Sequence, residues 1–138
     1  MRRLIVTQAM LIVMLVPALA ASQTAPALPL DGTTWSVRVT PDEAATKKGD
    51  APFDDILVFN NGHVAMSECL KYGFKASKYS AEKTQDGWTV STEQVSEKAG
   101  KSVWDMAISG DVLKGTLVST KLDGTVLKYA VEGKKAGK

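Results

Sequence analysis

Cysteine and histidine are almost absent from this chain, which has one of each, Cys69 and His63, among its 138 residues. A single cysteine cannot close an internal disulfide, and a lone cysteine is more often buried than exposed, so we expect Cys69 to be buried and inert. A zinc site would need carboxylates for its remaining ligands, and no recognisable spacing supplies them. The sequence therefore predicts no metal site.

A catalytic constellation is missing as well. His63 would have to serve any Ser-His-Asp arrangement, and it follows directly on a tight-turn signal, where a solvated residue is expected. No nucleophile has a recognisable base beside it. We therefore predict no catalytic residues, no cofactor and no enzymatic activity.

The chain also lacks a strong excess of charge. Its net charge is +2, and Arg2 and Arg3 account for all of it, so the remainder is neutral. A neutral domain has no long-range field that would concentrate phosphate polymers near it. We therefore expect no nucleic-acid partner.

A long hydrophobic run occurs only at the N-terminus. Arg2 and Arg3 precede an apolar stretch from Leu4 to Val16, and Ala18-Leu19-Ala20 has the pattern of a cleavage site. The stretch is shorter than the roughly 20 apolar residues of a membrane span. We predict that residues 1–20 are a cleaved signal peptide, that the mature chain has no membrane span, and that it is periplasmic or extracellular.

Helical periodicity is weak in the rest of the chain, whereas short alternating apolar runs between Gly, Asn and Asp are frequent. Residues 21–30 contain two prolines and are predicted to be a flexible lead-in, and residues 31–138 a single β domain. About eight strands are expected. They are Thr34–Thr40, Asp55–Asn60, His63–Ser67, Lys75–Ala81, Trp88–Gln94, Ser102–Ser109, Val112–Lys121 and Thr125–Gly133.

The turn residues predict how several strands pair. Asn61-Gly62 favours a two-residue type I′ turn, and Gly110-Asp111 a type II′ turn. The last connection has two possible lengths, a two-residue loop at Asp123-Gly124 or a three-residue loop from Leu122 to Gly124. The longer loop keeps the large apolar residues on one face, so it is preferred. The expected pairs are Phe59 with Val64, Leu57 with Met66, Ile108 with Leu113, Met106 with Gly115, Trp104 with Leu117, Leu117 with Tyr129, Gly115 with Val131 and Ser119 with Leu127.

Sequential hairpins with one apolar face would leave two exposed sheet edges unless the sheet closes. We therefore predict an all-β fold, an antiparallel up-and-down barrel, in which mid-strand Gly115 allows a close approach or sharp bend. Two segments interrupt the strand pattern. Pro41–Asp54 is expected to be a long polar loop, and Ser67–Phe74 a helical turn capped by Ser67 and ended by Gly73.

The opening Leu30-Asp31-Gly32-Thr33-Thr34-Trp35, followed by hairpins that end in Gly133, resembles the calycins, the superfamily of lipocalins, fatty-acid-binding proteins and avidins. The segment Phe53–Gly62, with Ser67-Glu68-Cys69 and Gly73-Phe74 after it, is similar to a group of small secreted bacterial proteins of unassigned function. The resemblance implies a lipocalin-like barrel. It implies no activity.

Aromatic residues are few, yet most fall on the apolar face of the expected strands. The leading hypothesis is a binding module that holds a small apolar ligand inside the barrel; Phe74, Tyr79 and Trp88 would then line one mouth. The alternative is that these side chains simply fill the core. A second hypothesis is a protein-interaction module, such as an inhibitor of a secreted hydrolase, that uses residues 21–30 or Pro41–Asp54. The expected ligand-binding residues are Trp35, Phe59, Trp104, Met106 and Tyr129.

Overall fold

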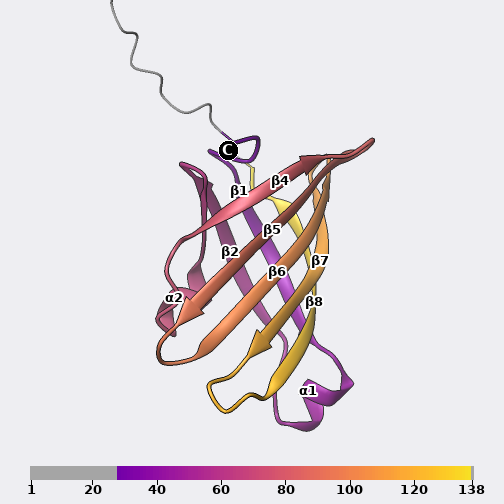
Figure 1. Cartoon of the computed structure of the whole chain (residues 1–138). Coiled ribbons are helices and arrows are strands. Elements are labelled where there is room, and N and C mark those ends of the chain that lie inside the picture. Colours follow the sequence, from indigo (N-terminus) through magenta and orange to yellow (C-terminus); the bar gives the residue numbers. More distant parts are fainter. Residues whose placement is uncertain (1–27, 138) are drawn as a thin grey trace, which may run out of the picture.

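A computed structural model describes residues 28–137, in which eight antiparallel strands follow one another in chain order and close into a barrel (Figure 1). The predicted signal peptide and residues 21–27 of the predicted lead-in lie outside the described residues. Closure occurs where the last strand pairs with the first, which confirms the all-β barrel. The elements are β1 (Thr34–Pro41), α1 (Glu43–Lys47), β2 (Phe53–Asn60), β3 (His63–Met66), α2 (Ser67–Lys71), β4 (Ser77–Lys83), β5 (Gly87–Ser96), β6 (Gly100–Ser109), β7 (Val112–Thr120) and β8 (Val126–Lys135).

The predicted turns and pairings are confirmed. Asn61 and Gly62 both have positive φ, as a type I′ turn requires, and Gly110 has φ 57°. At the last hairpin Lys121 N donates to Thr125 O over 2.8 Å, so the loop has three residues, with Gly124 at φ 89°. All eight predicted pairs, from Phe59 with Val64 to Ser119 with Leu127, are observed.

The core lies in the middle and upper part of the barrel, where side chains from all strands meet. Alternation along each strand sends one residue inward and the next outward, so the burial pattern of β5 and β6 repeats every two residues. The largest fully buried side chains come from β1, β2, β3 and β6. They are Trp35, Trp104, Phe59, Leu57 and Met66.

Gly115 provides the close approach that the sequence predicted. A Cβ atom at this position would lie 2.2 Å from the backbone oxygen of Asp105 and 2.8 Å from Cα of Met106 on β6. Contacts below 3 Å to backbone atoms cannot be relieved by a side-chain rotation. Glycine is therefore needed for β6 and β7 to pack as tightly as they do.

Pro41–Asp54 is not the simple loop we predicted. The strand β1 continues to Pro41, β2 already begins at Phe53, and the connection contains α1. The carboxylate of Asp42 accepts a hydrogen bond from Ala45 N (2.8 Å) and so caps the first turn of this helix. Side-chain capping therefore makes a helix out of residues that periodicity alone placed in a loop.

The predicted helical turn at Ser67–Phe74 is present as α2, but Ser67 does not cap it. Ser67 is the first helical residue, and its hydroxyl donates to Ile56 O (3.3 Å). The capping acceptor is instead Asp55 on β2, whose Oδ1 lies 2.9 Å from Glu68 N. Gly73, with φ 84°, follows the helix as expected.

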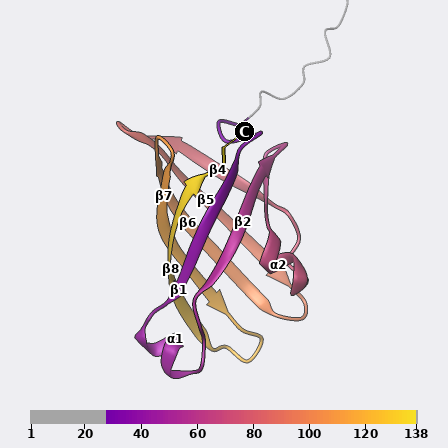
Figure 2. The same cartoon turned by 180° about the vertical axis from the view of Figure 1, so that it is seen from behind.

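The upper end of the barrel, where β1 begins and the β2–β3 turn lies, is closed by residues 28–33 (Figure 2). Leu30, which we assigned to the flexible lead-in, is buried, and its backbone N–H donates to the hydroxyl of Tyr79 (3.2 Å). The same hydroxyl donates to Asp31 Oδ1 (2.9 Å), which also accepts from Gly62 N (2.9 Å). Long-range hydrogen bonds that local sequence does not reveal therefore fix the end of the predicted lead-in on the barrel.

Candidate functional site

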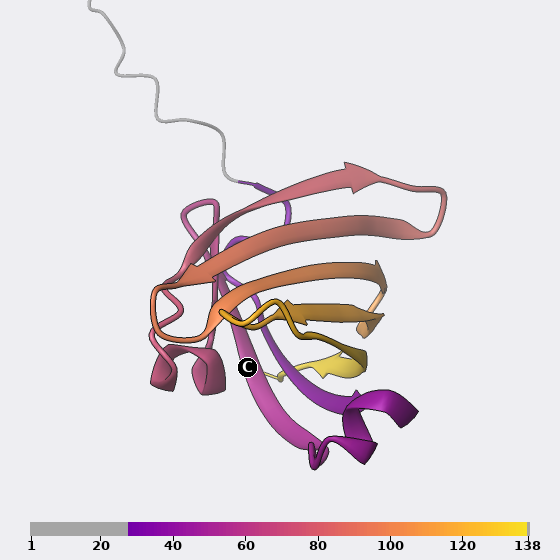
Figure 3. The ribbon, with the colours of Figure 1, turned by 60° about the horizontal axis from the view of Figure 1, so that its bottom comes forward.

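The lower end of the barrel is surrounded by α1, α2 and the β5–β6 and β7–β8 turns (Figures 1 and 3). A cavity of about 490 Å³ lies at this end. Most of its wall is apolar or aromatic, with polar groups on one side and at the mouth. The apolar and aromatic lining residues are Ala51, Pro52, Phe53, Cys69, Tyr72, Phe74, Ala99, Leu117, Leu127 and Tyr129. The polar ones are Asp50, Glu68, Ser102, Ser119 and Lys121.

One side of the mouth is held by the segment that joins α1 to β2. Tyr129 on β8 donates its hydroxyl hydrogen to Asp50 Oδ2 over 2.8 Å, and its ring meets Phe53 edge-on with 6.3 Å between centroids. Burial, together with the hydrogen bond to the Asp50 carboxylate, raises the pKa of Tyr129. The phenol therefore stays protonated and keeps the segment attached to the barrel wall.

The opposite side of the mouth is formed by α2, behind which Asp55 is buried with 3 % of its surface exposed. Burial raises the pKa of Asp55, and the hydrogen bonds from Glu68 N and Ile56 N offset only part of this effect. Its second oxygen lies 3.9 Å from Sγ of Cys69. Burial, with the nearby charges of Asp55 and Glu68, raises the pKa of the Cys69 thiol to about 12. Cys69 is thus buried, as predicted, and protonated at neutral pH.

The raised pKa of Cys69 predicts that its thiol reacts slowly with disulfide reagents. Because the thiolate is the reactive form, native Cys69 should react with a disulfide reagent at pH 8 roughly a hundredfold or more slowly than in guanidinium-unfolded protein. The native rate should keep rising about tenfold per pH unit up to pH 10, whereas the unfolded rate should level off near the ordinary thiol pKa. Stopped-flow labelling measures both, and equal native and unfolded profiles would contradict the assignment.

The wall formed by β6 and β7 differs from the rest, since Ser102 and Ser119 face each other there and both border the cavity. Two buried polar atoms next to this wall have no hydrogen-bond partner within residues 28–137, namely Gln94 Oε1 and Trp104 Nε1. Gln94 is paired with Ser102 across the β5–β6 ladder. The cavity therefore has a polar area at Ser102 and Ser119 within a lining that is otherwise mainly apolar.

Only one of the five predicted ligand-binding residues lines this cavity. Tyr129 does so, whereas Trp35, Phe59, Trp104 and Met106 are buried in the core, with at most 3 % of their surface exposed. The sequence places all five on the inner face, but it contains no information on which part of the interior the side chains fill.

The prediction that Phe74, Tyr79 and Trp88 together line one mouth of the barrel is wrong. Phe74 borders the lower cavity, while Tyr79 contributes to the hydrogen bonds that close the upper end. Trp88 is half-buried, with the ammonium of Lys83 4.9 Å from its ring centre. Sequence reasoning also missed Phe53 and Leu127 as wall residues; their only signal was an inward position at the end of a strand.

A second, wider hollow of about 730 Å³ lies over the outer face of β2, β1, β8 and β7. The charges of its outward side chains alternate between positive and negative from strand to strand. The strand pairing places them in one row, in the order Lys114, Glu132, Arg38 and Asp54. The row is exposed, and Arg38 and Asp54 already form an ion pair of 3.0 Å. Exposed charges that neutralise one another give little affinity, so we take the lower cavity as the candidate site.

Residues 28–137 contain no group of three or more metal-ligating side chains, and none of their helices is long and apolar enough to cross a membrane. His63 lies beside the β2–β3 turn, with Nδ1 2.8 Å from Asn61 O.

Comparison of the chain with protein-family models, curated proteins and solved structures finds no match. Its function is therefore argued from the cavity.

Proposed function

We propose that this protein is a non-enzymatic binding module that holds a small, mainly apolar ligand in the cavity at the lower end of the barrel. The observation that carries the proposal is a cavity of about 490 Å³ walled largely by aromatic and aliphatic side chains. This volume is in the range of small-molecule sites, which are mostly apolar with a few polar groups. The ligand would lie against Phe53, Phe74, Leu117 and Tyr129 rather than among the tryptophans of the core.

The arrangement of the two barrel ends supports the same proposal. The upper end is closed by residues 28–33, and the core below it is filled by Trp35, Phe59 and Trp104. A ligand would therefore enter only from the lower end and penetrate only part of the barrel. The exposed side chains of Tyr72 and Leu122 at this end, 64 % and 68 % accessible, would extend the apolar surface at the entrance.

A matched pair of alanine-to-tryptophan substitutions tests the site. Ala99 lines the cavity, whereas Ala107 is exposed on the outer face of β6. With the neutral fluorescent probe N-phenyl-1-naphthylamine, Ala99→Trp should weaken binding at least about tenfold because the indole fills the cavity, and Ala107→Trp should change it less than about twofold. Fluorescence titration measures both, and equal binding by the two variants would place the probe outside the cavity.

Native mass spectrometry of protein purified from its natural source addresses the ligand directly. A co-purified species lost on denaturation, and absent from Ala99→Trp, would support the proposal.

We further propose a calycin-type relationship, which the up-and-down barrel and the opening Gly32-Thr33-Thr34-Trp35 support. Export to the periplasm or beyond is proposed from residues 1–20; a purified mature protein that begins after Ala20 would support it.

A further inference from the structure

The lining of the cavity differs in chemistry from one side to the other, so a bound ligand would meet different groups on its two sides. On one side lie Phe53 and the ring of Tyr129, which offer apolar contact, while Leu127 adjoins Ser119 on the neighbouring strand. On the other lie the hydroxyl groups of Ser102 and Ser119, which pair in register on neighbouring strands. A hydroxyl group both donates and accepts hydrogen bonds, so this wall can satisfy a polar group of either kind.

The polar groups behind this wall are incompletely satisfied. Among the buried polar side chains of β5, Thr92 donates to Lys78 O and Ser96 to Tyr72 O, each over 2.8 Å. Gln94, between them, is fully buried; its amide nitrogen donates to Lys75 O over 3.3 Å, and its Oε1 has no partner. An unused acceptor therefore belongs to the residue paired with Ser102 on the neighbouring strand.

An unused donor lies beside the acceptor. Trp104 follows Ser102 by two residues on the same face of β6, and its Nε1 has no partner. It pairs with Leu117 on β7, which borders the cavity, and with Thr92 on β5, which does not. Directly paired side chains in a sheet have Cβ atoms about 5 Å apart, so these groups lie one side-chain layer from the cavity.

Together these groups specify the chemistry of the ligand. We propose, building on the binding function above, that the cavity takes an uncharged amphipathic molecule whose polar edge carries both a hydrogen-bond donor and an acceptor and lies against Ser102 and Ser119. Ser102 can accept from a ligand donor while it donates to Gln94 Oε1, and Ser119 can donate to a ligand acceptor. Unsatisfied buried polar groups are unfavourable, so a ligand that satisfies them binds better than an apolar one of the same shape.

The charges around the cavity argue against an ionised inner end. Asp50, Glu68 and Lys121 are the charged wall residues; Lys121 is exposed, and Asp50 and Glu68 are half-buried. Glu68 is already bonded to Lys71 and Asp50 to Tyr129. The inward neighbours of Ser102, namely Gln94, Ser119 and Trp104, are neutral, so an ionised group there would lose its hydration without gaining a counter-charge from them.

Equilibrium dialysis with four probes of one shape tests this inference: naphthalene, 2-naphthol, 2-naphthamide and 2-naphthoate. We expect 2-naphthamide, which carries a donor and an acceptor, to bind at least about tenfold more tightly than naphthalene, 2-naphthol to lie between them, and 2-naphthoate to bind no better than naphthalene. Gln94→Leu should reduce the tenfold advantage of the amide to less than about threefold. Thr89→Val, on the outer face of β5, should leave it unchanged.

The outcomes separate the inference from the binding function. If all four probes bind equally, or 2-naphthoate binds best, the polar-wall inference is overturned while the cavity remains a binding site. If no probe binds and Ala99→Trp has no effect, the binding function itself fails. Circular dichroism checks the fold of Gln94→Leu. If that variant does not fold, Ser102→Ala takes its place. We expect the same loss of the tighter binding of 2-naphthamide over naphthalene. If Ser102→Ala leaves this difference in affinity unchanged, the inference is overturned.

Discussion

Trp35→Ala is expected to lower the free energy of unfolding by about 4–5 kcal/mol, at the upper end of the range for large buried side chains. Trp35 has 1 % of its surface exposed and pairs with Leu57 on β2 and Lys135 on β8, so its side chain packs where the first and last strands close the barrel. Its indole N–H also donates to Thr33 Oγ1 over 3.0 Å, and this hydrogen bond would be lost. Urea denaturation followed by circular dichroism gives the free energy.

Trp88→Ala is the matched control for this prediction. Trp88 is only half-buried at the edge of the core, and its ring also carries a cation–π contact with Lys83. Its removal should cost only about 1 kcal/mol, with the same dependence on urea concentration. Equal losses for the two tryptophans would mean that closure between β8 and β1 is not where the barrel is stabilised.

Gly115→Val is expected to destabilise the protein by about 3 kcal/mol or more, or to prevent folding. The added Cβ would meet the backbone of β6, 2.2 Å from Asp105 O, and two γ carbons would add to the crowding. Since the obstacle is backbone, shortening the side chain opposite should not help. Thermal unfolding of Gly115→Val and of the double variant Gly115→Val/Met106→Ala should show similar losses.

Thr116→Val provides the control on the same strand. Thr116 is exposed on the outer face of β7, so the substitution should change stability by less than about 0.5 kcal/mol. Full rescue of Gly115→Val by Met106→Ala would show instead that side-chain crowding, rather than the approach of two backbones, requires the glycine.

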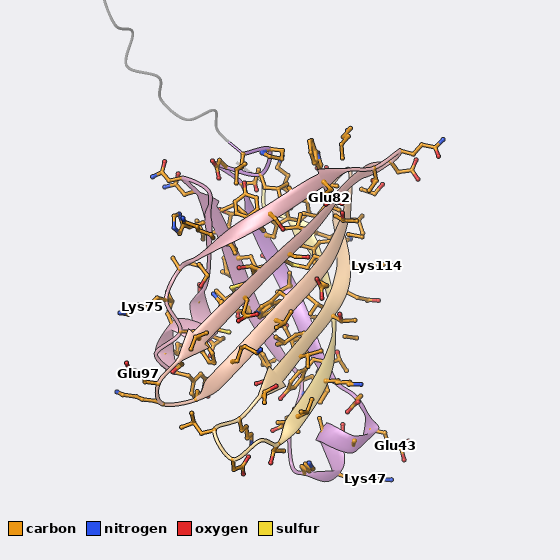
Figure 4. All side chains as sticks on the ribbon, in the orientation of Figure 1. Glu43, Lys47, Lys75, Glu82, Glu97 and Lys114 are labelled. Atoms are coloured by element: carbon orange, nitrogen blue, oxygen red, sulfur yellow. The ribbon has the colours of Figure 1, made fainter. Side chains whose placement is uncertain are left out.

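Local sequence predicted the strands well, because alternation and turn chemistry act over a few residues. Figure 4 shows the side chains of the strands on both faces of the sheet. The positive φ of Asn61, Gly62 and Gly124 could be expected from residue type, and the three-residue last loop followed from keeping Leu117 and Tyr129 on one face. The capping of α2 could not be predicted in this way. Asp55 is separated from Glu68 by 13 positions, and only the path of β2 and β3 brings them together.

At the candidate site, the difference between what local sequence predicts and what the closed barrel determines is larger. The sequence placed Tyr129 and the tryptophans on one inner face, but whether an inward side chain fills the core or borders a cavity depends on how much space remains after all eight strands have contributed. That space is a property of the closed barrel. Phe53 and Leu127 border the cavity because they lie where strands end and fewer side chains converge.

The sequence by itself determined the eight strands, the turns and registers of the β2–β3, β6–β7 and β7–β8 hairpins, and many of the side chains that face inward, since these depend on φ preferences and on a two-residue period. Only the tertiary structure decided which end is closed, where Leu30 and Asp31 dock, and where a cavity remains. Those features arise from contacts between residues far apart in the chain, and a two-residue period contains no information about them.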